Sequence, residues 1–342
     1  MSTLLNGQLG LRAESVFGTP VVVNAFYEPN TQPSIELTTA IARSTGLRSG
    51  QRAIYGDRFS IVARDVAGDF ETDLYTRGMG KLVEAAMTAA GTSTIIGAGP
   101  GYQQLFTQGT ADFLNSYTIQ VGVPFLGGAV QPHTYNGMMC SGFELSGAID
   151  DIPKLTTSWV GRDMLTATAL ATASYPVQVP FTFNEATIGL GGTLVVPTTT
   201  ALGSGATANA DITGFTVKYE NNFDGGGRNF GSTGALTRKK ARGMPMLSGT
   251  LEVEYVSNTL RDAFLSNTSL ALSITYTDTT AITGSVFPAF QIAIPAIKLK
   301  GKLPVQGANG DVPIQSIEWE MVDDRVASHP FYVVIVTAET AI

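Results

Sequence analysis

Residues 151–159 read Asp-Ile-Pro-Lys-Leu-Thr-Thr-Ser-Trp, and residues 311–319 read Asp-Val-Pro-Ile-Gln-Ser-Ile-Glu-Trp. Trp159 and Trp319 are the only two tryptophans of the 342-residue chain. Each follows an Asp-x-Pro sequence whose aspartate lies eight residues before the tryptophan. A rare residue that recurs in the same local context predicts that one domain occurs twice along the chain.

Shorter landmarks recur upstream of the tryptophans in the same order. The offset between matched residues falls from 188 at the first landmark to 160 at the tryptophans, as expected if the first copy carries extra loop residues. The matched pairs are Ser44-Thr45-Gly46 with Ser232-Thr233-Gly234, Gly68-Asp69-Phe70-Glu71 with Gly249-Thr250-Leu251-Glu252, and Val121-Gly122-Val123-Pro124 with Ile292-Ala293-Ile294-Pro295. The period is the size of a domain, which favours a tandem duplication over a solenoid.

Composition indicates a β-rich protein that buries surface in an assembly. A chain of 342 residues corresponds to about two domains of roughly 100–200 residues each. Charged residues make up 14% of the chain, whereas about 25% is typical of soluble domains. The net charge of −7 argues against general nucleic-acid binding, because such binding depends on a basic face.

The sequence predicts a protein that is made and first kept in a cytoplasm. Cys140 is the only cysteine, so no internal disulfide can form, and packing is its expected role. No basic segment followed by an apolar one opens the chain, so we expect no signal peptide. No run of about 18 apolar residues is present to span a bilayer, and we expect no membrane partner.

Alternating apolar and polar residues predict strands with one buried face. Phe215, Val217 and Tyr219 show this period, and so do the residues around Trp319. Apolar residues at helical spacing predict one short helix in each copy. The helical stripes are Met79, Leu82, Val83, Ala86 and Met87 in the first copy and Leu260, Ala263 and Phe264 in the second.

These elements predict a mainly β protein with two domains of β-sandwich or partial-barrel type. Each domain is expected to carry one packed α-helix and one long inter-strand loop. The predicted boundaries are an extended arm over 1–33, a first domain over 34–165, a linker or insertion rich in Gly, Thr and Ala over 166–210, and a second domain over 211–342.

Residues that could support catalysis are scarce. His133 and His329 are the only histidines, and neither lies in a cluster with the spacing of metal ligands. The glycine-rich stretches 97–101 and 225–227 do not fit a phosphate-binding loop between a strand and a helix. The paired acids Asp150-Asp151 and Asp323-Asp324 fit solvated strand ends better than a metal site. We therefore predict no enzyme activity, no cofactor and no metal.

Basic residues concentrate in two loops at matching places in the two copies. Nine of the 21 lysines and arginines lie there, and each loop holds a single acid. The alternatives are ordinary solvated loops or nucleic-acid contacts. We expect docking loops that meet acidic surfaces on neighbouring subunits. The residues are Arg43, Arg48, Arg52 and Arg58 in the first loop, and Arg228, Arg238, Lys239, Lys240 and Arg242 in the second.

Several segments resemble tail tube (major tail) proteins of long-tailed, non-contractile bacteriophages, with the tube domain present twice. The opening Gly10-Leu-Arg-Ala-Glu-Ser-Val-Phe-Gly-Thr-Pro-Val21, followed by Phe26-Tyr27, carries the most specific part of the resemblance. Phe215–Asn222, the segment 249–265 and Ile294-Pro295 follow in the order seen in that family. Residues 170–210 lie outside the resemblance.

The resemblance implies a structural virion protein. Subunits of this family form six-fold rings whose inner sheets join into one barrel, and the rings stack into a conduit for DNA ejection. Implied partners are other copies of the chain, a tape-measure protein, a tail terminator and tip or baseplate proteins, with viral DNA passing without specific binding. If each chain carries two tube domains, three chains complete a ring with pseudo-six-fold symmetry, and a ring of six chains is the alternative. Trp159 and Trp319 would be equivalent core anchors.

Two other classes compete with this interpretation. A secreted or surface adhesin or carbohydrate-binding module could also be a β-sandwich, but a signal peptide is lacking and tryptophan is scarce. Another phage structural protein, such as a baseplate hub or a head decoration protein, could share the fold class. The tandem tube-like repeat is the main feature that distinguishes the tail tube interpretation from this second alternative.

Overall fold

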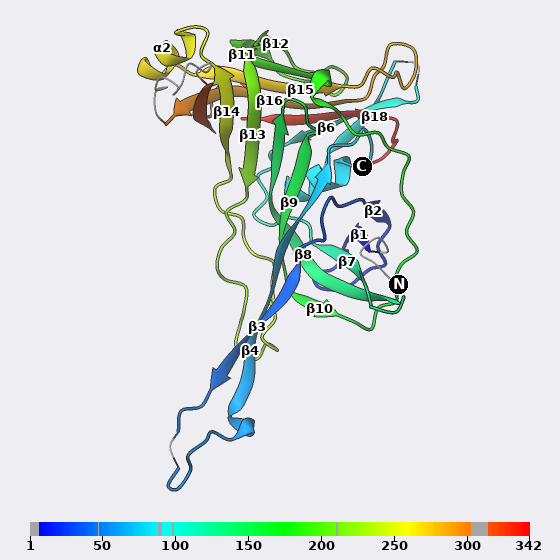
Figure 1. The fold of residues 1–342 in the computed structure, drawn as a ribbon, viewed down its shortest axis with the longest axis vertical. Helices are drawn as coiled ribbons and strands as arrows, with labels where there is room; N and C mark the ends of the chain where they lie inside the picture. The colour runs from blue at the N-terminus through cyan, green and yellow to red at the C-terminus, as the bar shows by residue number, and fades with distance from the viewer. Residues whose placement is uncertain (1–6, 47, 88–90, 98, 210, 302–313) are drawn as a thin grey trace.

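The computed structural model describes residues 7–46, 48–87, 91–97, 99–209, 211–301 and 314–342. These residues are mainly β, with 49% in strands and 6% in helices, which confirms the predicted fold class. Eighteen strands and two short α-helices are described, and Figure 1 shows their arrangement. The Asp-Val-Pro stretch at 311–313, part of the second repeat motif, lies outside the described residues.

The first half of the chain contains the strands β1 to β10 and the helix α1. In chain order they are β1 (Gln8–Ala13), β2 (Ala25–Tyr27), β3 (Glu36–Arg43), β4 (Phe59–Asp73), α1 (Gly80–Ala86), β5 (Thr92–Ile96), β6 (Gly101–Thr107), β7 (Tyr117–Pro124), β8 (Val130–Ala148), β9 (Lys154–Gly161) and β10 (Asp163–Leu165). The second half contains β11 (Ala186–Val195), β12 (Ser204–Ala208), β13 (Ile212–Glu220), β14 (Met246–Glu254), α2 (Thr259–Leu265), β15 (Leu270–Thr277), β16 (Ala289–Lys300), β17 (Ile314–Met321) and β18 (Tyr332–Thr337).

Eight strands form one continuous antiparallel sheet, which we call the wall. Its order is β3, β4, β9, β8, β13, β14, β17 and β16. The first four strands come from the first half of the chain and the last four from the second half. The pairing of β8 with β13 joins the two groups, over residues 142–148 and 214–220.

Strands β8 and β16 each continue from the wall into an outer layer of strands. The early part of β8 pairs with β7 and β10, and the early part of β16 pairs with β15 and β18. In Figure 1 the outer strands β15, β16 and β18 cross the direction of β13 and β14. Such orthogonal packing places apolar side chains of both layers in a shared core.

The strand pairings of the first half recur in the second half. Seven pairings match one to one, and β5, β6 and the junction of β8 with β13 have no counterpart among the described residues. The first set is β1–β2, β1–β7, β3–β4, β4–β9, β7–β8, β8–β9 and β8–β10. The second set is β11–β12, β11–β15, β13–β14, β14–β17, β15–β16, β16–β17 and β16–β18.

The predicted arm and linker contribute strands to these sheets. Residues 1–33 contain β1 and β2, and β1 pairs along its whole length with β7. Residues 166–210 contain β11 and β12, and β11 pairs with β15. Both segments are thus built into the outer layer.

Both predicted helices are present and short. Helix α1 buries Leu82, Val83 and Ala86, the apolar stripe that the spacing predicts. Helix α2 is followed by Asn267, which adopts a left-handed conformation with φ of 52°. A residue of this kind is a common helix end, because asparagine tolerates positive φ better than most residues.

One hairpin projects far from the body of the molecule. It consists of β3 and the first part of β4, connected by residues 44–58, and Figure 1 shows it extending alone below the remaining strands. Most residues from 38 to 62 are exposed. This hairpin contains the first of the two predicted basic loops.

Candidate assembly surfaces

The two tryptophans occupy matching positions in the wall. Trp159 of β9 lies opposite Gly68 of β4, and Trp319 of β17 lies opposite Gly249 of β14. Both indoles are buried, with 1% of each residue exposed. A Cβ atom at Gly249 would lie 2.8 Å from Cζ2 of Trp319 and 1.9 Å from the carbonyl oxygen of Thr216. Two landmarks of the sequence repeat therefore meet in space in each half of the chain.

The polar environments of the two indoles differ. Nε1 of Trp159 donates a hydrogen bond of 2.9 Å to the hydroxyl of Thr157, and its ring stacks on Phe70 with 6.1 Å between centroids. Nε1 of Trp319 is buried and has no hydrogen-bond partner among the described residues. Ile317 holds the place, two residues before the tryptophan, that Thr157 holds in the first half. One indole is therefore satisfied and the other is not.

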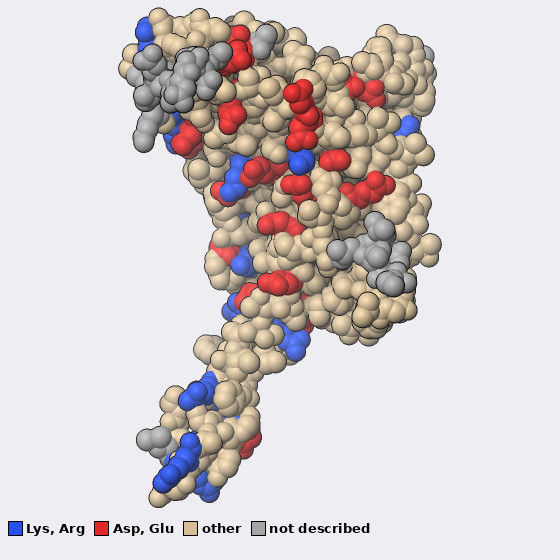
Figure 2. Space-filling model, in the orientation of Figure 1, with Lys and Arg blue, Asp and Glu red and all other residues tan. Residues whose placement is uncertain are grey.

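The first basic loop lies at the tip of the projecting hairpin. Arg43, Arg48 and Arg52 are exposed there, and none of them makes an ion pair with any described residue. Arg58 is half-buried: its guanidinium donates to the carbonyl of Gly46 and lies 5.7 Å from the ring centroid of Tyr55. Figure 2 shows these blue side chains gathered at the end of the hairpin.

The hairpin also exposes apolar side chains. Ile41 is 59% exposed, Ile61 is 51% exposed, and Tyr55, Phe59 and Val62 are between 47% and 49% exposed. Soluble monomers rarely gather so many large apolar residues on one projection, and such patches mark interaction surfaces. The hairpin therefore combines positive charge with uncovered apolar area.

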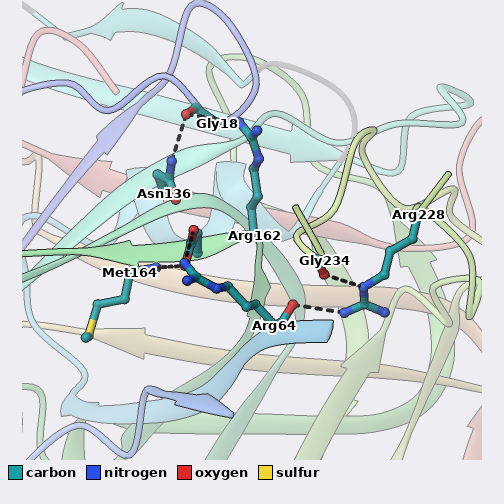
Figure 3. Close-up of polar contacts among 8 residues, drawn as sticks. Gly18, Arg64, Asn136, Arg162, Met164, Arg228 and Gly234 are labelled. Atoms are coloured by element: carbon teal, nitrogen blue, oxygen red, sulfur yellow. Dashed lines mark hydrogen bonds and ion pairs between the residues drawn. The ribbon is translucent and has the colours of Figure 1, made fainter. Parts of the chain in front are cut away.

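The second basic loop folds back onto the first half of the chain. Arg228 donates from Nη2 to the carbonyl of Arg64 on β4 at 2.9 Å and from Nε to the carbonyl of Gly234 at 2.9 Å. It also forms an ion pair with Asp65. Figure 3 shows Arg228 reaching across to Arg64, whose own guanidinium pairs with Asp163 at 3.0 Å. Arg228 thus acts inside the chain.

The remaining bases of the second loop are also largely engaged within the chain. Nζ of Lys239 donates to the carbonyl of Leu114 at 2.8 Å, and burial lowers the pKa of Lys239. Nη2 of Arg242 donates to the carbonyl of Gly109 at 2.6 Å. Arg238 pairs with Asp224 at 2.8 Å, and this hydrogen bond lowers the pKa of the Asp224 carboxyl. Lys240 is half-buried. The two predicted basic loops therefore lie in different environments.

The polar face of the wall is strongly acidic. On β9, β13, β14, β17 and the later part of β4, buried residues alternate with residues that point away from the core. The strand pairings put alternate residues of β3, β8 and β16 on the same outward face. Eleven carboxylates but only four lysines occupy these outward positions. The carboxylates are Glu36, Asp65, Asp69, Glu71, Asp73, Glu144, Glu220, Glu252, Glu254, Glu318 and Glu320, and the lysines are Lys154, Lys218, Lys298 and Lys300. Figure 2 shows acidic side chains spread over the body with basic ones among them, whereas basic side chains predominate on the hairpin.

Two of the four lysines on this face are neutralised by neighbouring acids. Nζ of Lys218 lies 2.8 Å from a carboxylate oxygen of Glu220, and the hydrogen bond and charge of Glu220 raise the pKa of Lys218. Lys300 forms an ion pair with Glu320 on the adjacent strand. The unpaired charge on the face is therefore predominantly negative.

The wall has an open edge at each end. Just before β3, the N–H of Ser34 donates to the carbonyl of Asp69 at 2.9 Å. Alternate N–H groups along β3 therefore face away from β4. The strand at the other end of the wall is β16, whose residues up to Ile297 pair with β15 on one side. On that side, the part of β16 after Ile297 has no strand partner among the described residues. Open edges with free backbone groups are templates for pairing with another strand.

The lone thiol and the histidines show no reactive arrangement. Cys140 is fully buried in the wall, and burial raises its pKa to about 12, so the thiol stays protonated at neutral pH. His329 packs edge-on against Tyr332. In the described part of the chain, no group of three or more His, Cys, Asp or Glu residues could hold a metal ion. No described helix is both long enough and apolar enough to cross a membrane.

A family model described as phage tail tube protein matches residues 5–321. The chain belongs to the phage tail tube protein family. Members of this family are structural components of the virion tail and not enzymes. A comparison with curated proteins gives no match. Membership of this family implies self-assembly into a tube with other tail proteins.

The sequence interpretation did not identify which residues form the acidic face. Its signal is present in the alternation of Glu252 with Glu254 and of Glu318 with Glu320. Such pairs place two carboxylates on one face of a strand. The wall order then brings carboxylates of distant strands together, and no local pattern predicts that order.

Proposed function

We propose that this tail tube protein polymerises into rings that stack into the phage tail tube, the conduit for DNA ejection into the host. Two features of the wall support the proposal: its open edges at β3 and β16, and the acidity of its polar face. The tube would be completed by a tape-measure protein inside and by terminator and tip proteins at its ends.

We further propose that each chain contains two copies of one tube domain. The seven matched strand pairings support this, and so do the equivalent contacts of Trp159 with Gly68 and of Trp319 with Gly249. The matched strands shift the proposed boundaries outward, because β1 corresponds to β11 and β2 to β12. The first copy would then run over 8–165 and the second over 186–337, with β5 and β6 as an insertion in the first.

The junction of β8 with β13 indicates how neighbouring chains would join. Within one chain, β8 ends the first group of four wall strands and pairs with β13, which begins the second group. In the two matched sets of strand pairings, β16 corresponds to β8, and β3 corresponds to β13. Pairing of β16 with β3 of the next chain would therefore repeat the internal junction and remove both open edges.

Barrel geometry favours three chains per ring. Three chains of eight wall strands supply 24 strands. At a spacing of about 4.8 Å and a tilt of about 35–45°, a barrel of 24 strands is roughly 45–50 Å across at the backbone. Six chains would supply 48 strands and a barrel about twice as wide. The six domains of a three-chain ring also agree with the six-fold rings that the family resemblance implies.

In this ring the polar face of the wall would line the lumen. The core side of the wall is covered by the outer strands and helix α1, so only the polar face remains for the interior. Eleven carboxylates against four lysines per chain would repel DNA phosphates and prevent DNA from binding during ejection. The acidic face is the observation that best supports the conduit role.

Electron microscopy of the purified protein tests the tube-forming role. We expect hollow tubes of uniform width with regular cross-striations when the protein is concentrated in near-physiological salt. The acidic lumen adds a second expectation, since assembled tubes should not retain duplex DNA added at physiological salt. A protein that remains monomeric at every concentration would contradict the proposal.

A further inference from the structure

We infer that the outer layer carries a carbohydrate-binding groove that takes a short neutral glycan. The groove consists of two adjoining recesses, of about 370 Å³ and about 470 Å³, which share Tyr27 and Tyr175 as lining residues. Recesses of about 300–1,000 Å³ are typical of sites for small molecules. Glycan binding would be a second function, additional to the proposed formation of tubes.

The groove is built around residues 174–180, which we call the strap. Pro176 and Pro180 keep the strap extended. The strap is fixed to the segment after β4, since the N–H of Thr76 donates to the carbonyl of Val179 at 3.0 Å. Figure 1 shows the strap, in green, along the margin of the molecule opposite β13 and β14. The groove therefore lies apart from these strands, whose polar face would line the lumen.

Tyr175 supplies the groove with an exposed aromatic ring. It is 41% exposed, and its ring packs edge-on against Phe26 of β2 with 6.0 Å between centroids. The C–H face of a sugar ring is apolar and packs on such a ring, while the sugar hydroxyls stay available for hydrogen bonds. In the proposed second copy, β12 corresponds to β2 and contains no aromatic residue. The domain fold therefore does not require aromatic residues at this place.

Tyr27 provides a buried hydroxyl that lacks a partner. The residue is 3% exposed, and its hydroxyl makes no hydrogen bond with any described residue. Burial raises the pKa of Tyr27, so the hydroxyl keeps its proton and can donate as well as accept. A buried hydroxyl without a partner is unfavourable, and a sugar hydroxyl bound in either recess would supply one.

The first recess contains one base and one acid that do not neutralise each other. Lys81 and Glu339 both line it, and neither forms an ion pair with a described residue. Gly78 donates its N–H to one carboxylate oxygen of Glu339 at 2.9 Å, and the other oxygen accepts no hydrogen bond from the described chain. A charged ligand would meet a like charge here, whereas sugar hydroxyls can accept from the ammonium and donate to the carboxylate. The recess therefore favours a neutral polyhydroxylated ligand.

The strap is poorly suited to bind an extended peptide by strand addition. The N–H of Val179 donates to the hydroxyl of Thr76 at 3.3 Å, and its carbonyl accepts from the N–H of Thr76. Pro176 and Pro180 have no N–H to donate. Strand addition depends on free backbone groups of this kind, whereas a glycan is held by side chains. A glycan is therefore the occupant that the groove favours.

Repetition along a tube would strengthen a weak site. Each chain contributes one groove, so an assembled tube would present many grooves at regular intervals. Linked binding sites can exceed the affinity of a single site by about 100- to 10,000-fold. A tube could then hold a glycan-coated cell surface although each groove binds weakly. This consequence, unlike the groove itself, rests on the proposed tube function.

Titration with disaccharides tests the groove. We expect the unassembled full chain to bind at least one of maltose, lactose and chitobiose with a Kd on the order of 1 mM, measured by isothermal titration calorimetry and saturation-transfer NMR. Tyr175→Ala should lower the affinity about tenfold. Tyr55→Ala makes the same change at a tyrosine of the projecting hairpin that is 47% exposed. It is the matched control and should leave the affinity unchanged.

Tyr27→Phe gives a second readout. It should lower the affinity about three- to tenfold and leave the melting temperature unchanged or higher, because the hydroxyl has no partner in the free protein. A clear loss of stability would show that the hydroxyl is already paired without a ligand, which contradicts the inference. Failure of all three disaccharides to bind would overturn it, as would undiminished binding by Tyr175→Ala. These measurements use the unassembled subunit, so a failure to form tubes bears only on the proposed tube function.

Discussion

At the scale of single residues, the two tryptophans combine equivalent positions with different partners. Each indole lies opposite a glycine of the neighbouring strand, where a side chain would occupy the space of the ring or of the nearby backbone. Only Trp159 has its Nε1 satisfied, by Thr157. The same substitution can therefore be made and compared at two nearly matched sites.

We expect Trp159→Phe to destabilise the subunit more than Trp319→Phe. Both changes remove buried volume, which costs about 1–3 kcal/mol for a partly compensated core substitution. Trp159→Phe also leaves the buried Thr157 hydroxyl without its donor, which adds about 1 kcal/mol. Urea unfolding of the unassembled subunit measures both values. An equal or larger loss for Trp319→Phe would contradict the assigned hydrogen bonding.

Residue identity predicted some of these roles and not others. The tryptophans could be singled out from the sequence because the residue is rare and its context repeats. The partner of Arg228 could not, since Asp65 lies 163 residues away and the two meet only after the first half packs against the second. A cluster of bases predicts positive charge in a loop, but the fold decides whether that charge is neutralised within the chain.

At the scale of elements, β3 is the strand on which closure of the proposed ring depends. Asn221, directly after β13, donates its N–H to the carbonyl of Ser141 at 2.8 Å across the junction of β8 with β13. Gly68 of β4 and Gly249 of β14 hold matching places in the two sets of strands. When the strand register is counted from these glycines, Thr39 of β3 is the equivalent of Asn221. The N–H of Thr39 points away from β4, toward the open edge.

We expect Thr39→Pro to give a folded subunit that cannot form rings. Proline is tolerated on an edge strand when its missing N–H faces outward, but it removes a donor needed by an incoming strand. Sedimentation velocity should show monomers, with a melting temperature close to that of the natural sequence. Thr39→Ala keeps the N–H and should assemble. A Thr39→Pro variant that assembles as well as the natural sequence would exclude β3 as the joining edge.

The sequence predicted which segments are strands or helices better than it predicted which strands pair with one another. Strict alternation indicated β13 and β17, and helical spacing indicated α1 and α2. Strands β1, β2, β11 and β12 were hidden by proline, glycine and threonine, which favour extended or turn structure without specifying a partner. Their partners β7 and β15 lie far away in the sequence, so local propensity carries no information about the pairing.

At the scale of the whole molecule, the two ends of the chain differ in character along the direction of its wall strands. Positive charge and apolar residues extend at one end, carboxylates cover the other, and the polar face between them is acidic. The wall ends in two open edges that match the two strands of the internal junction. These features agree with a subunit that closes sideways into a ring and stacks end to end.

The central claim is that each chain contributes two domains to a ring of three chains. Cryo-electron microscopy of assembled tubes at side-chain resolution tests it most directly. We predict three chains per ring, with junctions of β8 with β13 inside each chain alternating with junctions of β16 with β3 between chains. Six chains per ring, or a ring in which each chain contributes only one four-strand group to the barrel, would contradict the account.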